Sequence, residues 1–246
     1  LMVCFGIGVV LAAFWAAGAP TNYDTGLYHL GAISYATEYP VIPGLANLHD
    51  RFGFNSSMWP LSALLGTGSL SGAGFRMLNG LLIAMACTDL FLRLRSGSRL
   101  RNSPGTFALA IGLVFVLGVV AQYPGRLIAS SAQDTAEMVL VVAAVAALLD
   151  VVSGWGRPLT RASAAVPIAL AVAAGSIRPL GWVFAIGVFG VVVVIARRRH
   201  DWQTTGRLLL PSILVSALLV IVMLVRDVVL SGWLLFPLSA FPVPVA

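Results

Sequence analysis

One stretch of the chain, residues 20–75, gathers ionisable and aromatic side chains that the neighbouring sequence lacks. Carboxylates and imidazoles are among the groups that most often transfer protons in enzymes. We therefore expect a catalytic or binding site in this stretch. The candidate catalytic residues are Asp24 and Asp50, and the candidate substrate-binding residues are Tyr28, His29, His49 and Arg51.

The spacing that follows Asp24 predicts a shared helix face. In a helix over residues 24–35, one face would carry Asp24, Tyr28, Gly31 and Tyr35, and another would carry Leu27, Leu30 and Ser34. The alternative is an amphipathic helix that lies at the membrane interface with its tyrosines at headgroup level.

A second group of acids follows Ser130 and Ser131. Ser131 and Asp134 match a capping box, in which a serine and an acid three residues later satisfy free N–H groups at the start of a helix. The functional alternative is that Asp134 or Glu137 faces a cavity beneath the first stretch. There it would help to bind an acceptor or a divalent cation.

Arg178 interrupts an apolar stretch, just before Pro179. One interpretation is a turn residue whose guanidinium reaches the lipid headgroups. The other is functional, because ionisable groups at membrane depth often mark binding sites. A guanidinium suits phosphate, so Arg178 is a candidate phosphate contact together with Arg51 and Arg126.

The elements that must position these residues are membrane helices. Hydrophobic residues make up 59% of the chain and charged residues 10%, whereas a soluble domain carries roughly 25% charged residues. Several apolar runs approach the roughly 20 residues that a helix needs to cross a bilayer, and they lack the alternation of barrel strands. The composition predicts an all-α, polytopic transmembrane bundle.

We predict seven spans, near residues 1–19, 76–93, 105–122, 135–152, 162–177, 180–196 and 207–225. Residues 59–74 are rich in Gly and Ser and are not expected to cross. One group of arginines then falls on one side, which the positive-inside rule makes cytoplasmic: Arg93, Arg95, Arg99, Arg101, Arg157, Arg161, Arg197, Arg198, Arg199 and Arg207.

This orientation places the N-terminus in the cytoplasm and makes residues 20–75 an extracytoplasmic loop with short interfacial helices. A single transmembrane domain is expected over residues 1–246. The chain has no initiator Met and no basic segment before its first apolar run, so we expect a fragment of a longer protein and no cleaved signal peptide. Near the cytoplasmic end of the second span, Asp89 and Arg93 are spaced as a structural ion pair.

Other protein classes are disfavoured. The net charge is +6, but the basic residues are scattered between apolar runs and form no nucleic-acid-binding face. Cys4 and Cys87 both lie in apolar runs, which argues against a disulfide framework or a zinc site.

Several strings together resemble the GT-C glycosyltransferases, which are multi-pass enzymes that use lipid-phosphate-linked sugars. These are Asn22-Tyr-Asp24-Thr-Gly-Leu-Tyr-His29 after the first span, Pro40 to Asn47, His49-Asp50-Arg51, and Phe75-Arg76 before the second span. The closer likeness is to uncharacterised bacterial multi-pass proteins that share Asp-Thr-Gly-Leu-Tyr-His, Asn-Leu-His-Asp-Arg and a tail like Ser231 to Pro237.

The resemblance implies that Asp24, the acid after the first span, acts in catalysis. It also implies a polyprenyl-phosphate-linked donor, an extracytoplasmic site and a bacterial plasma membrane. The sequence departs from the family pattern, because Asp24 is followed by Thr25 where many such enzymes have Glu, and Arg51 lies where several have Lys. A second acid would have to come from Asp50 or Asp134.

We therefore expect a membrane glycosyltransferase that transfers a sugar from a lipid-linked donor to an acceptor, with a divalent cation as a possible cofactor. Two alternatives stay open: a transporter or flippase of lipid-linked envelope intermediates, and a non-catalytic envelope-assembly subunit. A transporter would be expected to show inverted repeats and broken helices, and the sequence shows no internal repeat.

Overall fold

The computed structural model describes residues 2–68, 71–154, 159–238 and 241–243. The chain there is helical and contains no β-strand, in agreement with the predicted all-α class. In chain order the elements are α1 (Met2–Ala16), η1 (Thr25–His29), α2 (Leu30–Glu38), η2 (Leu45–Asn47), η3 (Asp50–Gly53), α3 (Met58–Leu65), η5 (Gly74–Arg76), α4 (Met77–Arg95), α5 (Ser98–Arg101), α6 (Pro104–Gln122), α7 (Pro124–Leu127), α8 (Gln133–Ser153), α9 (Arg161–Ile177), α10 (Gly181–Arg199) and α11 (Trp202–Ser231).

Within the described ranges, five helices are long and apolar enough to cross a membrane. They are α4 with the turn before it, α6, α8, α10 and α11. The apolar helices α1 and α9 are shorter, at 15 and 17 residues. The structure thus supports a helical membrane bundle, and two of the seven predicted spans fall below the usual spanning length.

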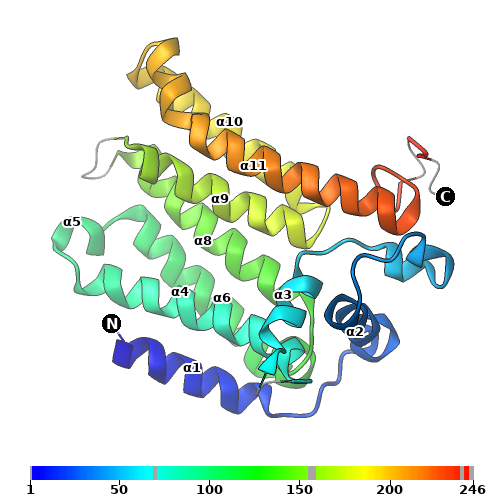
Figure 1. Ribbon diagram of the computed structural model, residues 1–246. Coiled ribbons are helices and arrows are strands. Elements are labelled where there is room, and N and C mark those ends of the chain that lie inside the picture. The colour runs from blue at the N-terminus through cyan, green and yellow to red at the C-terminus, as the bar shows by residue number, and fades with distance from the viewer. Residues whose placement is uncertain (1, 69–70, 155–158, 239–240, 244–246) are drawn as a thin grey trace.

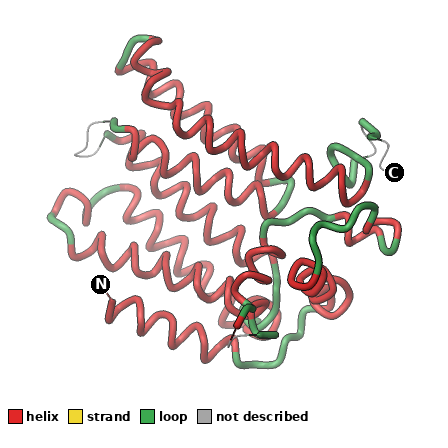
Figure 2. The backbone as a smooth tube through the Cα atoms, in the orientation of Figure 1, coloured by secondary structure: helices red, strands yellow, loops and turns green. Residues whose placement is uncertain are grey.

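The long helices lie side by side, and the segments between them gather at two ends of the bundle (Figures 1 and 2). One end, here called the site end, carries residues 17–68, 71–76, 123–132 and 178–180. The other, here called the arginine end, carries residues 96–103, 159–160 and 200–201. Helix α8 is central, because it packs against α6, α9, α4 and α10.

Local signals explain where the helices begin and end. Ser103, Thr160 and Asp201 cap α6, α9 and α11 by accepting hydrogen bonds from backbone N–H groups of the first turn. Gly154 and Gly232 end α8 and α11 with positive φ angles of 60° and 74°, a conformation that glycine adopts without a steric penalty.

The described part of residues 59–74, which is 59–68 and 71–74, contains no spanning helix. Helix α3 has eight residues, which gives a length of about 12 Å at 1.5 Å per residue. It packs against α2 and α4 at the site end, and Trp59 at its start is fully buried. This agrees with the prediction from its Gly and Ser content.

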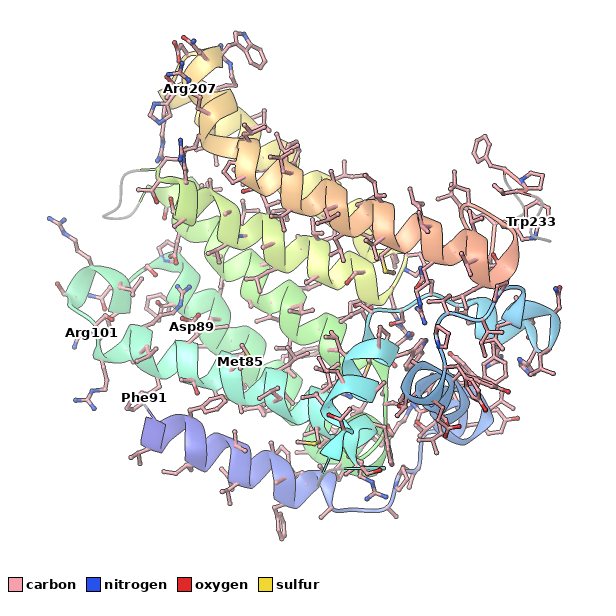
Figure 3. The ribbon with its side chains drawn as sticks, viewed as in Figure 1. Met85, Asp89, Phe91, Arg101, Arg207 and Trp233 are labelled. Atoms are coloured by element: carbon pink, nitrogen blue, oxygen red, sulfur yellow. The ribbon has the colours of Figure 1, made fainter. Side chains whose placement is uncertain are left out.

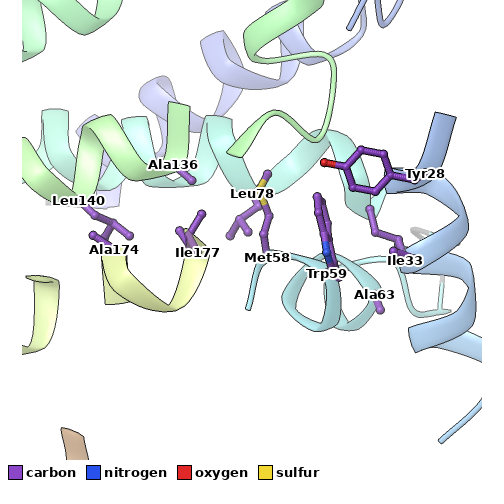
Figure 4. Packing of buried hydrophobic residues seen from close by; sticks show 11 residues of the cluster. Tyr28, Ile33, Met58, Trp59, Ala63, Leu78, Ala136, Leu140, Ala174 and Ile177 are labelled. Atoms are coloured by element: carbon purple, nitrogen blue, oxygen red, sulfur yellow. The ribbon is translucent and has the colours of Figure 1, made fainter. Parts of the chain in front are cut away.

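Helix α3 joins the loop to the bundle through one apolar cluster. Tyr28, Ile33 and Trp59 from residues 20–75 pack with Leu140 of α8 and Ile177 of α9 (Figure 4). Burying side chains of this size stabilises the fold by roughly 1.5–3 kcal/mol each. The first loop is therefore fixed to the ends of the helices.

The predicted spans nearly coincide with the observed helices in most cases, but the last helix is longer than its span. The span predicted near residues 207–225 lies within α11, which begins at Trp202 and continues past Arg226 and Asp227 to Ser231. Two interactions accommodate the extension: Arg226 donates to Asn55 at 2.5 Å, and Gly44 donates its backbone N–H to the Val229 carbonyl at 2.8 Å.

Candidate functional site

Asp24 lies directly before η1 at the site end and forms an ion pair with Arg51. The Arg51 Nη1 atom is 2.6 Å from Asp24 Oδ1. Both side chains are partly exposed, at 42% for Asp24 and 38% for Arg51. The two strings that were singled out in the sequence therefore meet, although 27 residues separate them.

The helix after Asp24 is not a regular α-helix. Residues Thr25–His29 form one π-helical turn, in which the N–H of Leu30 bonds to the carbonyl of Thr25. The predicted face of Asp24, Tyr28, Gly31 and Tyr35 is nevertheless kept. Asp24 and Tyr28 contact Arg51, and Gly31 and Tyr35 lie against Phe52. Leu27, Leu30 and Ser34 of the other predicted face are exposed. The π turn inserts one residue, and His29 is buried next to Tyr28.

His29 connects the first outer segment to the second. Its Nδ1 lies 3.2 Å from Ser131 Oγ and 3.5 Å from Thr25 Oγ1, and its ring packs against Trp59 at a centroid distance of 4.6 Å. Burial lowers the pKa of His29 from 6.5 to about 4. The imidazole is therefore neutral at pH 7.

Tyr28 lies between the Asp24–Arg51 pair and the aromatic core. The Arg51 guanidinium is 5.4 Å from the centre of its ring, a cation–π contact, and Trp59 and Phe54 meet the ring edge to face. Burial and then the Asp24 carboxylate raise the pKa of the phenol. Tyr28 thus stays protonated and able to donate a hydrogen bond.

A second ion pair is formed where α8 and α9 meet the site end. Arg178 Nη1 lies 2.5 Å from Asp134 Oδ1 and 3.7 Å from Glu137 Oε2. The predicted capping box at Ser131 is wrong, because Ala132 is the N-cap of α8 and makes no side-chain cap bond. Ser131 and Asp134 bond instead to His29 and Arg178.

Both ion pairs lie close enough to Tyr28 and His29 to affect their pKa values. Asp24 and Asp134 raise the pKa of His29, and Arg51 and Arg178 lower it, each less than burial does. The same four groups act on Tyr28. We call Asp24, Tyr28, His29, Arg51, Asp134, Glu137 and Arg178 together the two-pair site.

Three other candidate residues lie at the site end without joining this set. Asp50 is 83% exposed, and its carboxylate accepts from the Arg51 N–H and lies 3.1 Å from His49 Nδ1. His49 accepts from the same N–H and contacts Phe52. Arg126 is exposed, and within the described residues no ion pair joins its guanidinium to the two-pair site.

Two polar side chains at the site end, the buried Asn79 and the half-buried Asn55, make long-range hydrogen bonds that were not predicted from the sequence. Asn79 of α4 donates from Nδ2 to the carbonyls of Leu127 and Ala132, both at 2.9 Å, and to that of Ser130 at 3.3 Å. Asn55 donates to the Met223 carbonyl and accepts from Arg226. No local pattern predicts either set of bonds, because the partners lie 48 to 171 positions away along the chain.

The described residues contain no group of three or more His, Cys, Asp or Glu side chains arranged to hold a metal ion. Cys87 is a free, half-buried thiol, and the side chain of Cys4 lies outside the described residues. Asp89 and Arg93 form the predicted pair at 2.8 Å, and Arg93 also binds Asp150 at 2.6 Å.

Comparison with known proteins places the chain in one family. Residues 1–244 match the model of a domain of unknown function, DUF8201, and the chain belongs to that family. No curated protein and no solved structure shows significant similarity to it.

Proposed function

We propose that the protein is a membrane glycosyltransferase that transfers a sugar from a polyprenyl-phosphate-linked donor to an acceptor at the extracytoplasmic face. The observation that carries the proposal is the two-pair site. A carboxylate with an arginine partner lies beside a second arginine held by two acids, at the end of a membrane bundle.

The orientation and the seven crossings belong to the same proposal. The site end lies opposite the end that carries nine of the described arginines (Figure 3), so the positive-inside rule makes the site end extracytoplasmic. Helices α1 and α9 would then cross with the five longer helices, in a bacterial plasma membrane with the N-terminus in the cytoplasm. The two-pair site would then lie at the outer surface of the membrane, at the level of the lipid headgroups.

The chemistry requires a base and a phosphate contact. The acceptor oxygen attacks the anomeric carbon, the bond from that carbon to the phosphate oxygen breaks with inversion, and the leaving lipid phosphate keeps the electron pair. Asp24 takes the acceptor proton. Arg51 and Arg178 neutralise the charge that develops on the phosphate.

Arg51 would couple donor binding to the base. In the structure its guanidinium occupies one oxygen of Asp24. When a donor phosphate draws Arg51 away, this oxygen becomes free to accept a proton. Asp50 is the alternative base, and its exposed carboxylate lies one residue from Arg51.

The test is transfer by the purified protein with defined polyprenyl-phosphate sugars. Asp24→Asn keeps the size of the side chain and removes its basicity, so transfer should fall by about 10²–10⁴-fold, as expected for loss of a general base. The matched control is Glu38→Gln, because Glu38 is an exposed acid of the same loop whose partner is Ser34. Wild-type turnover by Asp24→Asn would refute the assignment of the base.

The same preparation separates the enzyme from the alternatives. A flippase would move a fluorescent lipid-linked sugar across vesicles without forming a product. A non-catalytic subunit would do neither. Transport without transfer by the wild-type protein would refute the proposed enzyme.

A further inference from the structure

A second site lies in the bundle, away from the two-pair site. Helices α4, α8 and α9 line a cavity of about 440 Å³. On α8 it extends from Val139 to Val151, which corresponds to a length of about 18 Å at 1.5 Å per residue. The cavity is therefore an elongated groove along the helix axis.

The groove is apolar along its length and charged at one end. Ala143, Val166 and Leu170 are typical of its walls, and Met85 and Val166 at its rim are about half-exposed. The charged members, Asp89, Arg93, Asp150 and Arg199, belong to the arginine end. Figure 3 labels Met85 and Asp89, one turn apart on α4. A ligand must therefore pair a long apolar chain with a polar head.

The charges select an anionic head. Arg93 binds both Asp89 and Asp150, at 2.8 Å and 2.6 Å, so both carboxylates already have a partner. Among the described residues Arg199 makes one hydrogen bond, a long one of 3.4 Å to the Val151 carbonyl. A guanidinium has five donors, and most of those on Arg199 make no hydrogen bond to the residues that the structure describes.

The residues around Arg199 at the arginine end are also mostly positively charged. At the arginine end the described residues include nine arginines and three aspartates: Arg93, Arg95, Arg99, Arg101, Arg161, Arg197, Arg198, Arg199 and Arg207, with Asp89, Asp150 and Asp201. This positive potential attracts a lipid with a net negative charge. It does not attract a zwitterionic lipid, because the charges of that headgroup cancel.

We infer that this groove binds one acyl chain of an anionic phospholipid, with its phosphate on Arg199. The lipid belongs to the leaflet at the arginine end, opposite the two-pair site. The inference rests on the groove and its charges, and it stands whether or not the proposed glycosyl transfer is correct.

The experiment measures lipid binding to the full chain by native mass spectrometry, with phosphatidylglycerol and phosphatidylcholine of identical acyl chains. Phosphatidylglycerol should bind more tightly. Arg199→Gln should weaken it by about tenfold, the size expected for loss of a hydrogen bond to a charged group. The matched control is Arg198→Gln, which removes an exposed charge from the same helix turn and should leave binding unchanged.

Two further arms test the groove itself. Ala143→Phe fills it and should abolish binding of both lipids, and Ala143→Leu replaces that variant if Phe prevents folding. Glycerol phosphate alone should not displace the lipid, because it lacks the apolar chain. Equal binding of the two lipids, equal effects of the two arginine variants, or full displacement by glycerol phosphate would overturn the inference.

Discussion

Arg178 is a charge at the edge of an apolar stretch, and two acids hold it in place. Its guanidinium pairs with Asp134 at 2.5 Å and lies 3.7 Å from Glu137. Snorkelling to the headgroups was one interpretation of this residue in the sequence. Its acidic partners are a second reason for its position, and they leave part of the side chain, 41%, accessible to a ligand.

Substitution of Arg178 should therefore distinguish a role in binding the donor phosphate from a role as a structural anchor. If Arg178 contacts a donor phosphate, Arg178→Ala should lower the efficiency of transfer by about 10–100-fold, since a charged hydrogen bond contributes roughly 1.5–3 kcal/mol. Arg178→Lys keeps the charge and should lose less. The measurement is kcat/KM for the lipid-linked donor, and equal values for both variants and wild type would leave Arg178 with a structural role.

The depressed pKa of His29 predicts a pH dependence of stability. Burial lowers this pKa to about 4, from 6.5 for an unperturbed histidine. Between these values the unfolded chain binds a proton that the folded chain does not, so the free energy of unfolding should fall as the pH decreases from about 6.5 towards 4.

Thermal unfolding in detergent at pH 7 and pH 4.5 measures this effect. His29→Gln removes the titrating group and should reduce the difference between the two midpoints. His49→Gln is the control, because the His49 side chain is 41% exposed. An unchanged pH slope in His29→Gln would contradict the assignment.

At the site end, hydrogen bonds to backbone carbonyls hold the short segments that carry the functional side chains. No sequence pattern predicts these hydrogen bonds. Asn79 is fully buried at the start of α4 and donates to three carbonyls of residues 127–132. These carbonyls fix the chain that leads into α8, and Asp134 lies in its first turn. One side chain thus links the second span to the second ion pair.

Removing that link should destabilise the protein measurably. Asn79→Ala removes the Asn79 donor from the carbonyls of Leu127, Ser130 and Ala132, of which Leu127 keeps a hydrogen bond from Thr135. Each buried group left unsatisfied costs about 1–3 kcal/mol. We expect a lower unfolding midpoint and, if the two-pair site is functional, weaker donor binding. Asn102→Ala changes an exposed asparagine at the arginine end and should leave both quantities unchanged.

Elements with a strong apolar signal could be predicted from the sequence, whereas the π turn in the first loop could not. The predicted ends of α6 and α8 lie within two residues of those observed, because the apolar runs end there. The helical spacing after Asp24 predicted the face that meets residues 51–52. The contacts of Tyr28 and His29 with Trp59 join residues about 30 positions apart, and local spacing does not predict them.

The candidate site was likewise predicted only in part from the sequence. The sequence placed Asp24, Arg51, Asp134 and Arg178 on the same side of the membrane but did not predict which acid pairs with which arginine. It could not predict that Ser131 would bond to His29 instead of capping α8, because the two residues are 102 positions apart. Long-range polar contacts depend on how the helices pack.

At the scale of the whole molecule, the proposal depends on which end faces the outside. The described structure separates the site end from the arginine end, and the distribution of charge indicates which end faces the cytoplasm. The positive-inside rule concerns basic residues in short loops, and the segments 96–103 and 197–201 are short and rich in arginine. We therefore expect them to lie in the cytoplasm.

Cysteine labelling in intact cells tests this orientation, after Cys4 and Cys87 are replaced. Ser98→Cys and Leu48→Cys place single thiols at exposed positions of the arginine end and the site end. A membrane-impermeant maleimide should label Leu48→Cys in intact cells and Ser98→Cys only after permeabilisation. The reverse pattern would place the two-pair site in the cytoplasm, where an extracytoplasmic acceptor cannot reach Asp24, and the proposed reaction would fail with the topology.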